Sequence, residues 1–340
     1  MNGEQAMKAA VYYGPRDIRV EEVATPTLNN GDILLRIRAC GICGSDLHTY
    51  GHGLFEDLGI PVGSGRVLGH EFSGEVVEIN GQVEKLKVGD RVCGAGAGGN
   101  AEYSRVGASR VRGLLPIPEK IGFEEAATVE PLATSLHAVN LAEPRDGETH
   151  VIMGAGIIGL GVLQVLKARA AVKTIVADLS PKRLDMAQQL GADVIINADR
   201  EDTIQKVMEI TGTEQAPFMP GPTAKADAVF DCAGLPKSYT GTPVLQQAIS
   251  IVKREGKVVV VSVFEKPVTI EATHVVLKGI KIIGSWGWSL DEFRDSLELI
   301  TTDKVDRKPL ITHQFPLDKA SEAYETQLRA EEAVKVLIKP

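Results

Sequence analysis

Two separated stretches in the N-terminal half contain residue types that bind metal ions. The first reads CGICGSDLH at residues 40–48, and the second reads GHEFSG at residues 69–74. Zinc binds thiolate sulfur, imidazole nitrogen and carboxylate oxygen, and a catalytic zinc uses three such ligands while a fourth position stays open. Cys43, His70 and one glutamate would supply this set, so the pattern predicts a catalytic metal centre.

The first stretch also permits other interpretations. Cys40 and Cys43 form a C-x-x-C motif, which can be a redox pair or half of a four-thiolate zinc site. The four-thiolate interpretation lacks ligands, because the only other cysteines, Cys93 and Cys232, are isolated in the sequence. A redox pair is expected within a thioredoxin-like βαβ unit, whereas this motif follows an alternating strand at residues 33–38. A cysteine taken alone is usually a small buried hydrophobe.

A third stretch, further along the chain, is typical of dinucleotide binding. Residues 154–159 read GAGIIG, a G-x-G-x-x-G motif that follows an apolar strand at 150–153 and opens an apolar helix at 157–169. In this context the glycines allow a tight turn, close approach of a pyrophosphate and close helix packing, while the helix N-terminus attracts phosphate charge. The motif predicts that the cofactor-binding residues are Gly154, Gly156, Ile157, Ile158 and Gly159.

The end of the next strand predicts which dinucleotide is bound. Asp178 lies 24 positions after Gly154, where a carboxylate can accept both ribose hydroxyls of NAD and would repel the extra phosphate of NADP. The alternative is a helix N-cap, for which Asp is also favoured. A nearby cation, Arg183, could tolerate that phosphate. We expect NAD as the cofactor.

The elements that must position these residues fall into two groups. Residues 8 to about 111 contain short alternating strands broken by Gly, Pro and Asn, which predicts an antiparallel, barrel-like domain. From residue 150, buried strands alternate with helices, which predicts a parallel, doubly wound sheet. Residues 123–141 predict two helical pieces kinked at Pro131. The tail predicts helices at 290–301 and 321–330 and a last strand at 334–338.

Composition limits the classes of function. The chain has 340 residues, enough for two domains, and its net charge of −8 offers no basic face for nucleic acid or anionic lipid. We find no apolar run long enough for a membrane span and no signal peptide at the N-terminus, so the sequence predicts a cytoplasmic protein. Four cysteines without disulfide-framework spacing agree with a reducing compartment.

The paired motifs at 40–48 and 69–74 resemble the zinc signature of the medium-chain alcohol and polyol dehydrogenases. The dinucleotide motif and the ending KVLIKP at 335–340 extend the resemblance over essentially the whole chain. It implies a GroES-like β-barrel catalytic domain at 1–131, an NAD-binding Rossmann domain at 132–283, and a return at 284–340 that completes the catalytic domain. It also implies a homo-oligomer, either a dimer or a tetramer.

The resemblance further implies how the metal is held. Cys43 and His70 would be zinc ligands. The third ligand would be a carboxylate, either that of Glu71 or that of Glu130, since members of the family differ at this point. Asp46 would hold the second ring nitrogen of His70, although a turn-capping role fits the same position. Many relatives carry a four-cysteine lobe after residue 92, but this chain has Cys93 alone. We therefore expect one catalytic zinc per chain and no structural zinc.

The resemblance also implies roles in proton transfer and cofactor binding. Ser45 would take the alcohol proton and pass it through the cofactor ribose toward His48, because imidazole titrates near neutral pH. A solvated loop histidine is the alternative. Arg183 would contact the adenosine ribose. Lys335 would contact the nicotinamide-side phosphate, or be an ordinary surface lysine. The predicted catalytic residues are thus Ser45, His48 and Glu71.

The activity implied is oxidation of a secondary alcohol or polyol by zinc and NAD. Sorbitol-type members carry an Arg at the position of Gly287, between two tryptophans that either line the substrate site or belong to the core. The long loop at 49–68, with Phe55, Leu58 and Ile60, resembles that of threonine-type members. Two alternatives stay open: a threonine or amino-alcohol 3-dehydrogenase, and a zinc-free binding or structural protein on the same fold.

Overall fold

The computed structural model describes residues 6–53, 63, 65–215, 217–234 and 240–340. Half of the loop at 49–68, including Phe55, Leu58 and Ile60, lies outside these residues. Internal contacts divide the chain into one unit of residues 1–131 and 293–340 and a second unit of residues 132–292. The chain therefore returns to the first unit at residue 293, whereas the family resemblance implied a return at residue 284. No described helix combines the length and hydropathy that a membrane crossing requires.

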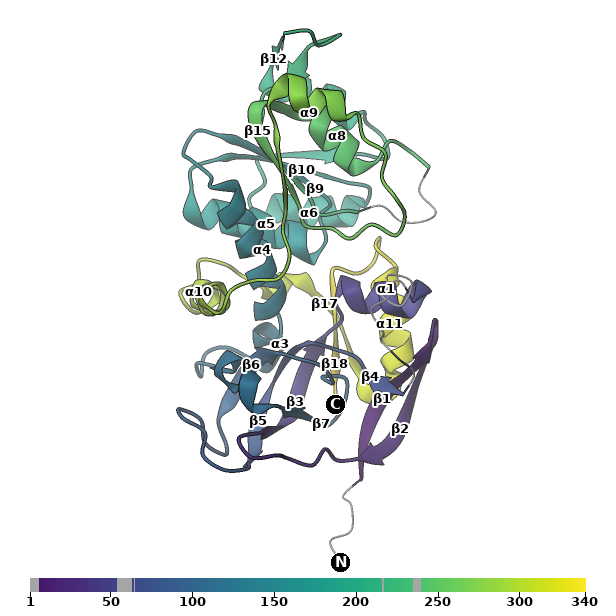
Figure 1. Ribbon diagram of the computed structural model, residues 1–340, viewed down its shortest axis with the longest axis vertical. Helices are drawn as coiled ribbons and strands as arrows, with labels where there is room; N and C mark the ends of the chain where they lie inside the picture. The colour runs from purple at the N-terminus through teal and green to yellow at the C-terminus, as the bar shows by residue number, and fades with distance from the viewer. Residues whose placement is uncertain (1–5, 54–62, 64, 216, 235–239) are drawn as a thin grey trace, which may run out of the picture. The chain divides into compact units, whose positions relative to one another are not determined.

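The first unit is built mainly of strands (Figure 1). Its elements before the second unit are β1 (Ala6–Gly14), β2 (Asp17–Ala24), β3 (Ile33–Gly41), α1 (Gly44–His52), β4 (Arg66–Val67), β5 (Glu71–Ile79), β6 (Arg91–Ala95), β7 (Tyr103–Val106), the 3₁₀ turn η1 (Ala108–Gly113), β8 (Leu115–Pro116) and α3 (Phe123–Ala126). The returning segment adds the 3₁₀ turn η2 (Lys308–Leu310), β17 (Ile311–Pro316), the 3₁₀ turn η3 (Leu317–Lys319), α11 (Ala320–Leu328) and β18 (Lys335–Lys339).

Two sheets organise this unit. The larger has the order β17-β18-β3-β5-β6-β8, with β7 also paired to β3, and the smaller has the order β2-β1-β4. All these pairs are antiparallel except β17 with β18. The C-terminal strand β18 thus lies beside β3, so residues near position 335 lie beside residues near position 41. The antiparallel part of the fold prediction is confirmed, while β17 was not expected from the sequence.

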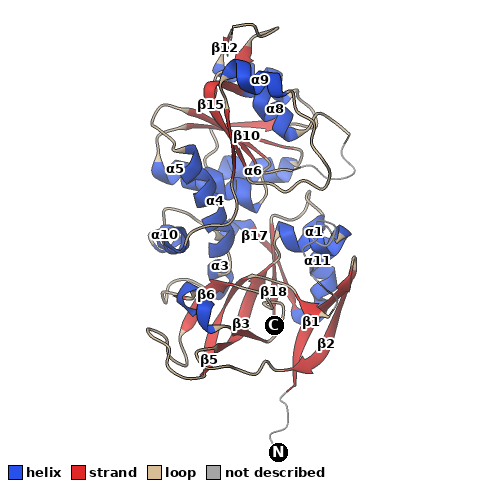
Figure 2. Cartoon of the chain, in the orientation of Figure 1, coloured by secondary structure: helices blue, strands red, loops and turns tan. Residues whose placement is uncertain are grey.

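The second unit alternates strands and helices around one parallel sheet (Figure 2). Its elements are β9 (Thr149–Met153), α5 (Ile157–Arg169), β10 (Lys173–Asp178), α6 (Pro181–Gln189), β11 (Val194–Asn197), α7 (Thr203–Thr211), β12 (Thr213–Glu214), β13 (Thr223–Ala224), β14 (Ala226–Asp231), α8 (Val244–Ile251), β15 (Val252–Val260), α9 (Ala272–Lys278) and β16 (Lys281–Gly284). The sheet order β11-β10-β9-β14-β15-β16 confirms the predicted doubly wound fold.

Helices α4 (Val129–Ala142) and α10 (Leu290–Thr301) contain the residues at which the chain passes between the units. The sequence predicted a kink at Pro131, but α3 ends at Ala126 and α4 starts at Val129, so the break precedes the proline. Pro131 lies in the first turn of α4, where a missing N–H breaks no intrahelical hydrogen bond. Helix α8 ends at Ile251 because β15 begins at the next residue, Val252.

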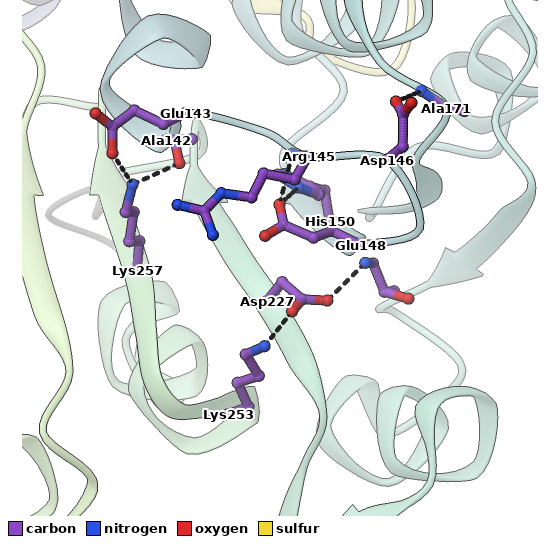
Figure 3. A network of polar contacts seen from close by, with 11 residues as sticks. Ala142, Glu143, Arg145, Asp146, Glu148, His150, Ala171, Asp227, Lys253 and Lys257 are labelled. Carbon is purple, nitrogen blue, oxygen red and sulfur yellow. Dashed lines mark hydrogen bonds and ion pairs between the residues drawn. The ribbon is translucent and has the colours of Figure 1, made fainter.

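A polar network holds the start of the parallel strands in the second unit (Figure 3). Asp227 accepts from the backbone N–H of Thr149 over 2.7 Å and pairs with Lys253. Glu148 lies 3.0 Å from Nε2 of His150, whose ring is fully buried and stacks on Phe230. Burial lowers the pKa of His150 below its ordinary value of 6.5.

Candidate active site

The structure brings three of the predicted metal ligands together. Cys43 is the N-cap of α1, His70 immediately precedes β5, and Glu71 is the first residue of β5. One donor atom from each lies within 4.8 Å of the other two. In the described residues this is the group of cysteine, histidine and acidic side chains that is close enough to hold a metal ion.

Asp46 connects the first two of these residues. Its Oδ2 accepts from the backbone N–H of Cys43 over 3.1 Å, which caps α1, and its Oδ1 lies 3.5 Å from Nδ1 of His70. Both roles considered for Asp46 from the sequence are therefore present. Because Nδ1 faces Asp46, Nε2 is the ring nitrogen that can bind a metal.

The charges around His70 and Asp46 stabilise each other. Burial favours neutral forms of both groups, but mutual attraction and hydrogen bonding outweigh it. The pKa of His70 is raised well above its ordinary value by Asp46 and Cys43, while the pKa of Asp46 is lowered by His70 and by backbone N–H groups. A metal ion that binds His70 must therefore displace a proton.

Glu71 is fully buried, and its carboxylate is held by a lysine from another strand of the same sheet. Its Oε2 accepts from Nζ of Lys335 over 2.6 Å, and the same ammonium group donates to the carbonyl of Ile42 over 2.8 Å. A Cβ atom on Gly41, the residue paired with Glu71 in β3, would lie only 2.1 Å from Oε2. Gly41 thus provides the space that this carboxylate occupies.

Two buried cations lie near Glu71. Lys335 is in direct contact with it, and Arg307, also fully buried, is attracted to it. Burial lowers the pKa of Arg307 to about 10, and the negative charge of Glu71 opposes this shift. Neither cation was assigned to this carboxylate from the sequence. The buried position of Lys335 excludes an ordinary surface lysine, and its role toward a cofactor phosphate stays a prediction.

The remaining sequence-predicted catalytic residues lie in the same unit. Ser45 and His48 are three positions apart in α1, so their side chains occupy one face of that helix, and both are half-buried. Glu130 lies in the first turn of α4 and is not a member of the 4.8 Å group formed by described residues. The geometry therefore favours Glu71 over Glu130 as the third ligand.

The three clustered residues fit a zinc ion by two observations. The donor set of sulfur, nitrogen and carboxylate oxygen is the one zinc prefers. Oε1 of Glu71 is buried and has no hydrogen-bond partner among the described residues, which is costly unless a cation binds it. Oε2 is engaged by Lys335, so Oε1 is the oxygen available to a metal.

In the second unit, the three motif glycines have different surroundings. Gly154 has φ of +101°, which side-chain-bearing residues rarely adopt. A Cβ on Gly159 would lie 1.8 Å from the carbonyl oxygen of Gly154, so this position permits helix α5 to pack against the loop. A Cβ on Gly156 would meet nothing closer than Nη1 of Arg183 at 3.9 Å. Gly156 therefore leaves open space in front of the loop, and Ile157 and Ile158 begin α5.

Asp178 is tied to this loop. Its Oδ2 accepts from the backbone N–H of Ala155 over 2.6 Å, and its Oδ1 accepts from that of Ser180 over 2.8 Å. The N-cap of α6 is Ser180, whose hydroxyl accepts from the N–H of Arg183, so the N-cap interpretation of Asp178 is wrong. The carboxylate instead sets the distance between β10 and the glycine loop.

Comparison with known proteins agrees with this geometry. Residues 29–140 match the model of the alcohol dehydrogenase GroES-like domain, and residues 158–302 match that of the zinc-binding dehydrogenases. A (R,R)-butanediol dehydrogenase from Bacillus subtilis is 31% identical over 98% of this chain and 100% of its own. The chain belongs to the medium-chain zinc-binding dehydrogenase family. It is a zinc-containing dehydrogenase that acts on CH–OH donors, and zinc and NAD(P) are typical of the family.

Other relatives extend the comparison. A sorbitol dehydrogenase from Bacillus subtilis is 30% identical and covers 99% of this chain and 98% of its own. The crystal structure of 2R,3R-butanediol dehydrogenase from Bacillus subtilis superposes with a TM-score of 0.83 at 30% identity, covering 98% of this chain and 99% of that one. A protein described as a zinc-binding dehydrogenase from Sinorhizobium meliloti 1021, solved with NADP, gives 0.83 at 27% identity over 99% of this chain and all of that one.

Proposed function

We propose that the protein oxidises a secondary alcohol or polyol to a ketone or aldehyde and transfers the hydride to NAD. The observation that carries the proposal is the close grouping of Cys43, His70 and Glu71. Oε1 of Glu71 is buried there and has no hydrogen-bond partner among the described residues. Relatives that match nearly the whole chain are named for a butanediol and for sorbitol. These names favour a substrate with more than one hydroxyl group.

Each residue has a distinct part in this proposal. Cys43, His70 and Glu71 would hold one zinc ion, with Glu130 as the alternative third ligand. Zinc bound there supplies Lewis-acid chemistry, which lowers the pKa of an oxygen that it contacts. Asp46 holds the His70 ring in the tautomer that presents Nε2.

Proton transfer would follow helix α1. Ser45 would accept the hydrogen bond of the alcohol hydroxyl and relay the proton toward His48, one turn further along the helix. The half-buried position of both side chains is compatible with such a relay. The glycine loop at 154–159 would bind the pyrophosphate, and Asp178 would accept the adenosine ribose hydroxyls, with Arg183 beside the loop.

The direct test is NADH formation by the purified protein with simple secondary alcohols, diols, sugar alcohols and L-threonine, each with and without a strong chelator. Chelator-sensitive turnover of a diol or sugar alcohol is expected. Turnover of L-threonine alone would favour the amino-alcohol 3-dehydrogenase. Freshly purified protein without bound zinc would instead favour a binding or structural protein on the same fold.

The choice of NAD over NADP is tested at Asp178. Asp178→Gly should raise the NADP to NAD ratio of kcat/KM by about tenfold or more, because a hydrogen bond to a charged group contributes about 1.5–3 kcal/mol. Asp178→Asn removes the charge but keeps one acceptor oxygen, so it retains one of the two hydrogen bonds to the N–H groups of Ala155 and Ser180. An unchanged ratio in both variants would assign Asp178 to loop architecture alone.

We also propose a homo-oligomeric assembly, a dimer or a tetramer, on the family resemblance. Light scattering of the purified protein measures the mass of the assembly against the 36.4 kDa chain. A mass equal to one chain would contradict this assignment.

A further inference from the structure

A buried hydrogen bond connects the segment before His70 to the C-terminal helix α11. Nδ2 of Asn100 donates to the hydroxyl of Tyr324 over 2.9 Å, and the two residues are 1% and 0% exposed. They are 224 positions apart in the sequence. Neither belongs to a motif, and neither has a part in the function proposed above.

The Asn100 side of this bond is fixed to the backbone that leads to His70. The N–H of Asn100 donates to the carbonyl of Leu68 over 3.1 Å, and the N–H of Gly99 donates to the carbonyl of Gly69 over 2.9 Å. A Cβ on Gly69 would lie 2.6 Å from Oδ1 of Asn100. The carboxamide is therefore packed directly on the residue that precedes His70.

The Tyr324 side is fixed to the helix that carries Asp46. The ring of Tyr324 packs on the ring of Tyr50, with centroids 5.1 Å apart, and Tyr50 lies in α1. Asp46 lies in the first turn of the same helix, 3.5 Å from His70. Tyr324 thus contacts α1 directly and, through Asn100, the segment that ends at His70.

We infer that Asn100 and Tyr324 are positioning residues that set the distance between Asp46 and His70, and so the orientation of the metal-binding ring. The inference rests on the proposed role of His70 as a zinc ligand. Partners outside the ligand set alter metal affinity by about 10- to 100-fold when they are removed.

Packing alone would not require this polar pair. Oδ1 of Asn100 is buried and has no hydrogen-bond partner among the described residues, so the carboxamide carries a desolvation cost. Apolar side chains of similar shape would fill the same space without that cost. What the polar pair adds is a directional contact between α11 and the segment at 68–70.

The test uses Tyr324→Phe, which deletes one hydroxyl and keeps the ring against Tyr50. Metal-free protein is titrated with Co²⁺ against a competing chelator, and the visible spectrum of the cobalt site reports its ligand geometry. We expect Co²⁺ affinity to fall about tenfold and the spectrum to shift. The matched control is Tyr50→Phe, whose hydroxyl donates to Glu325 over 2.7 Å and not toward the ligands. It should keep wild-type affinity and spectrum.

A second variant separates positioning from stability. Tyr324→Phe alone leaves the buried carboxamide of Asn100 without its partner and should lower the free energy of unfolding. Asn100→Leu combined with Tyr324→Phe removes both polar partners, so the free energy of unfolding should rise again toward that of wild type while Co²⁺ affinity stays low. Recovery of affinity together with stability would overturn the inference. Wild-type affinity and spectrum in Tyr324→Phe would also overturn it, leaving the zinc centre intact. Wild-type protein that binds neither Co²⁺ nor Zn²⁺ would refute the proposed zinc function and the inference with it.

Discussion

The metal cluster and the dinucleotide loop are constructed in opposite ways. The loop is local, because Gly154, Gly156 and Gly159 lie within one strand-to-helix turn and Asp178 ends the next strand. The cluster proposed to bind metal is non-local, since its residues lie at the start of α1 and at the start of β5, and Lys335, the charge partner of Glu71, comes from the last strand of the chain.

This difference follows from the chemistry of the two sites. Backbone N–H groups and a helix N-terminus recognise phosphate, and a single turn can supply them. In the metal cluster Cys43 and His70 are half-buried and Glu71 is fully buried, and a buried carboxylate needs a compensating positive charge because a buried charge is costly when unpaired. For Glu71 the compensating charges are Lys335 and the nearby Arg307. By their residue numbers, Lys335 lies 264 positions after Glu71 and Arg307 lies 236 positions after it.

The largest expected effect separates the two sites directly. Cys43→Ser removes the proposed sulfur ligand, so turnover should fall by more than about 100-fold, beyond the loss caused by changes in residues outside the ligand set. NADH binding, measured by fluorescence titration, should stay near that of wild type because the loop belongs to the other unit. Loss of NADH binding in this variant would break the comparison.

Lys335→Met tests the non-local character of the metal cluster. It leaves Glu71 buried without its direct ion-pair partner, a change that typically costs about 3–5 kcal/mol of stability. The free energy of unfolding, measured with urea on metal-free protein, should fall accordingly. A variant of wild-type stability with only a raised KM for NAD would show that Lys335 serves the cofactor phosphate instead.

Two glycine variants sharpen the description of the local site. Gly159→Ala places a Cβ 1.8 Å from a backbone oxygen, so both NADH affinity and the unfolding midpoint should decrease. Gly156→Ala has open space and should lower NADH affinity with little change in the midpoint. Calorimetry gives both quantities, and zinc content should be unchanged in each variant. Equal midpoints for the two variants would contradict the assignment of Gly159 to helix packing.

The smallest expected effect concerns the other end of the parallel sheet, at His150. The pKa of His150 is lowered in the folded state, so below about pH 6.5 the unfolded chain takes up the proton more readily. The free energy of unfolding therefore decreases as the pH is lowered. Glu148 and Asp227 oppose this shift and Lys257 adds to it. His150→Gln removes the titrating ring and can still donate to Glu148.

We expect this variant to reduce the pH slope of the unfolding free energy below pH 6.5 by up to about 1.4 kcal/mol per pH unit. Above that pH the two proteins should differ by a constant amount. Tryptophan fluorescence is a suitable probe, because both tryptophans, Trp286 and Trp288, lie in the second unit. Parallel pH profiles would show that His150 does not control the acid stability of this unit.

Interactions between close neighbours along the chain were predictable from the sequence. The glycine spacing at 154–159 and the buried strand before it predict the dinucleotide turn, because strand, turn and helix are contiguous. For Asp46 the family resemblance implied contact with the His70 ring, with a turn-capping role as the alternative, and the structure contains both interactions. The kink at Pro131 was wrong because proline is tolerated in a first helical turn, and the sequence did not show where α4 begins.

The sequence by itself determined the ligand types, the cofactor turn and the alternation that gives a doubly wound sheet. The tertiary structure decided that Glu71 joins Cys43 and His70, and that Lys335 is its ion-pair partner. It also brought Asn100 to Tyr324. The physical reason is that turns and caps depend on residues a few positions apart, whereas pairing of buried charges depends on strand register, which places β18 beside β3 and Gly41 opposite Glu71.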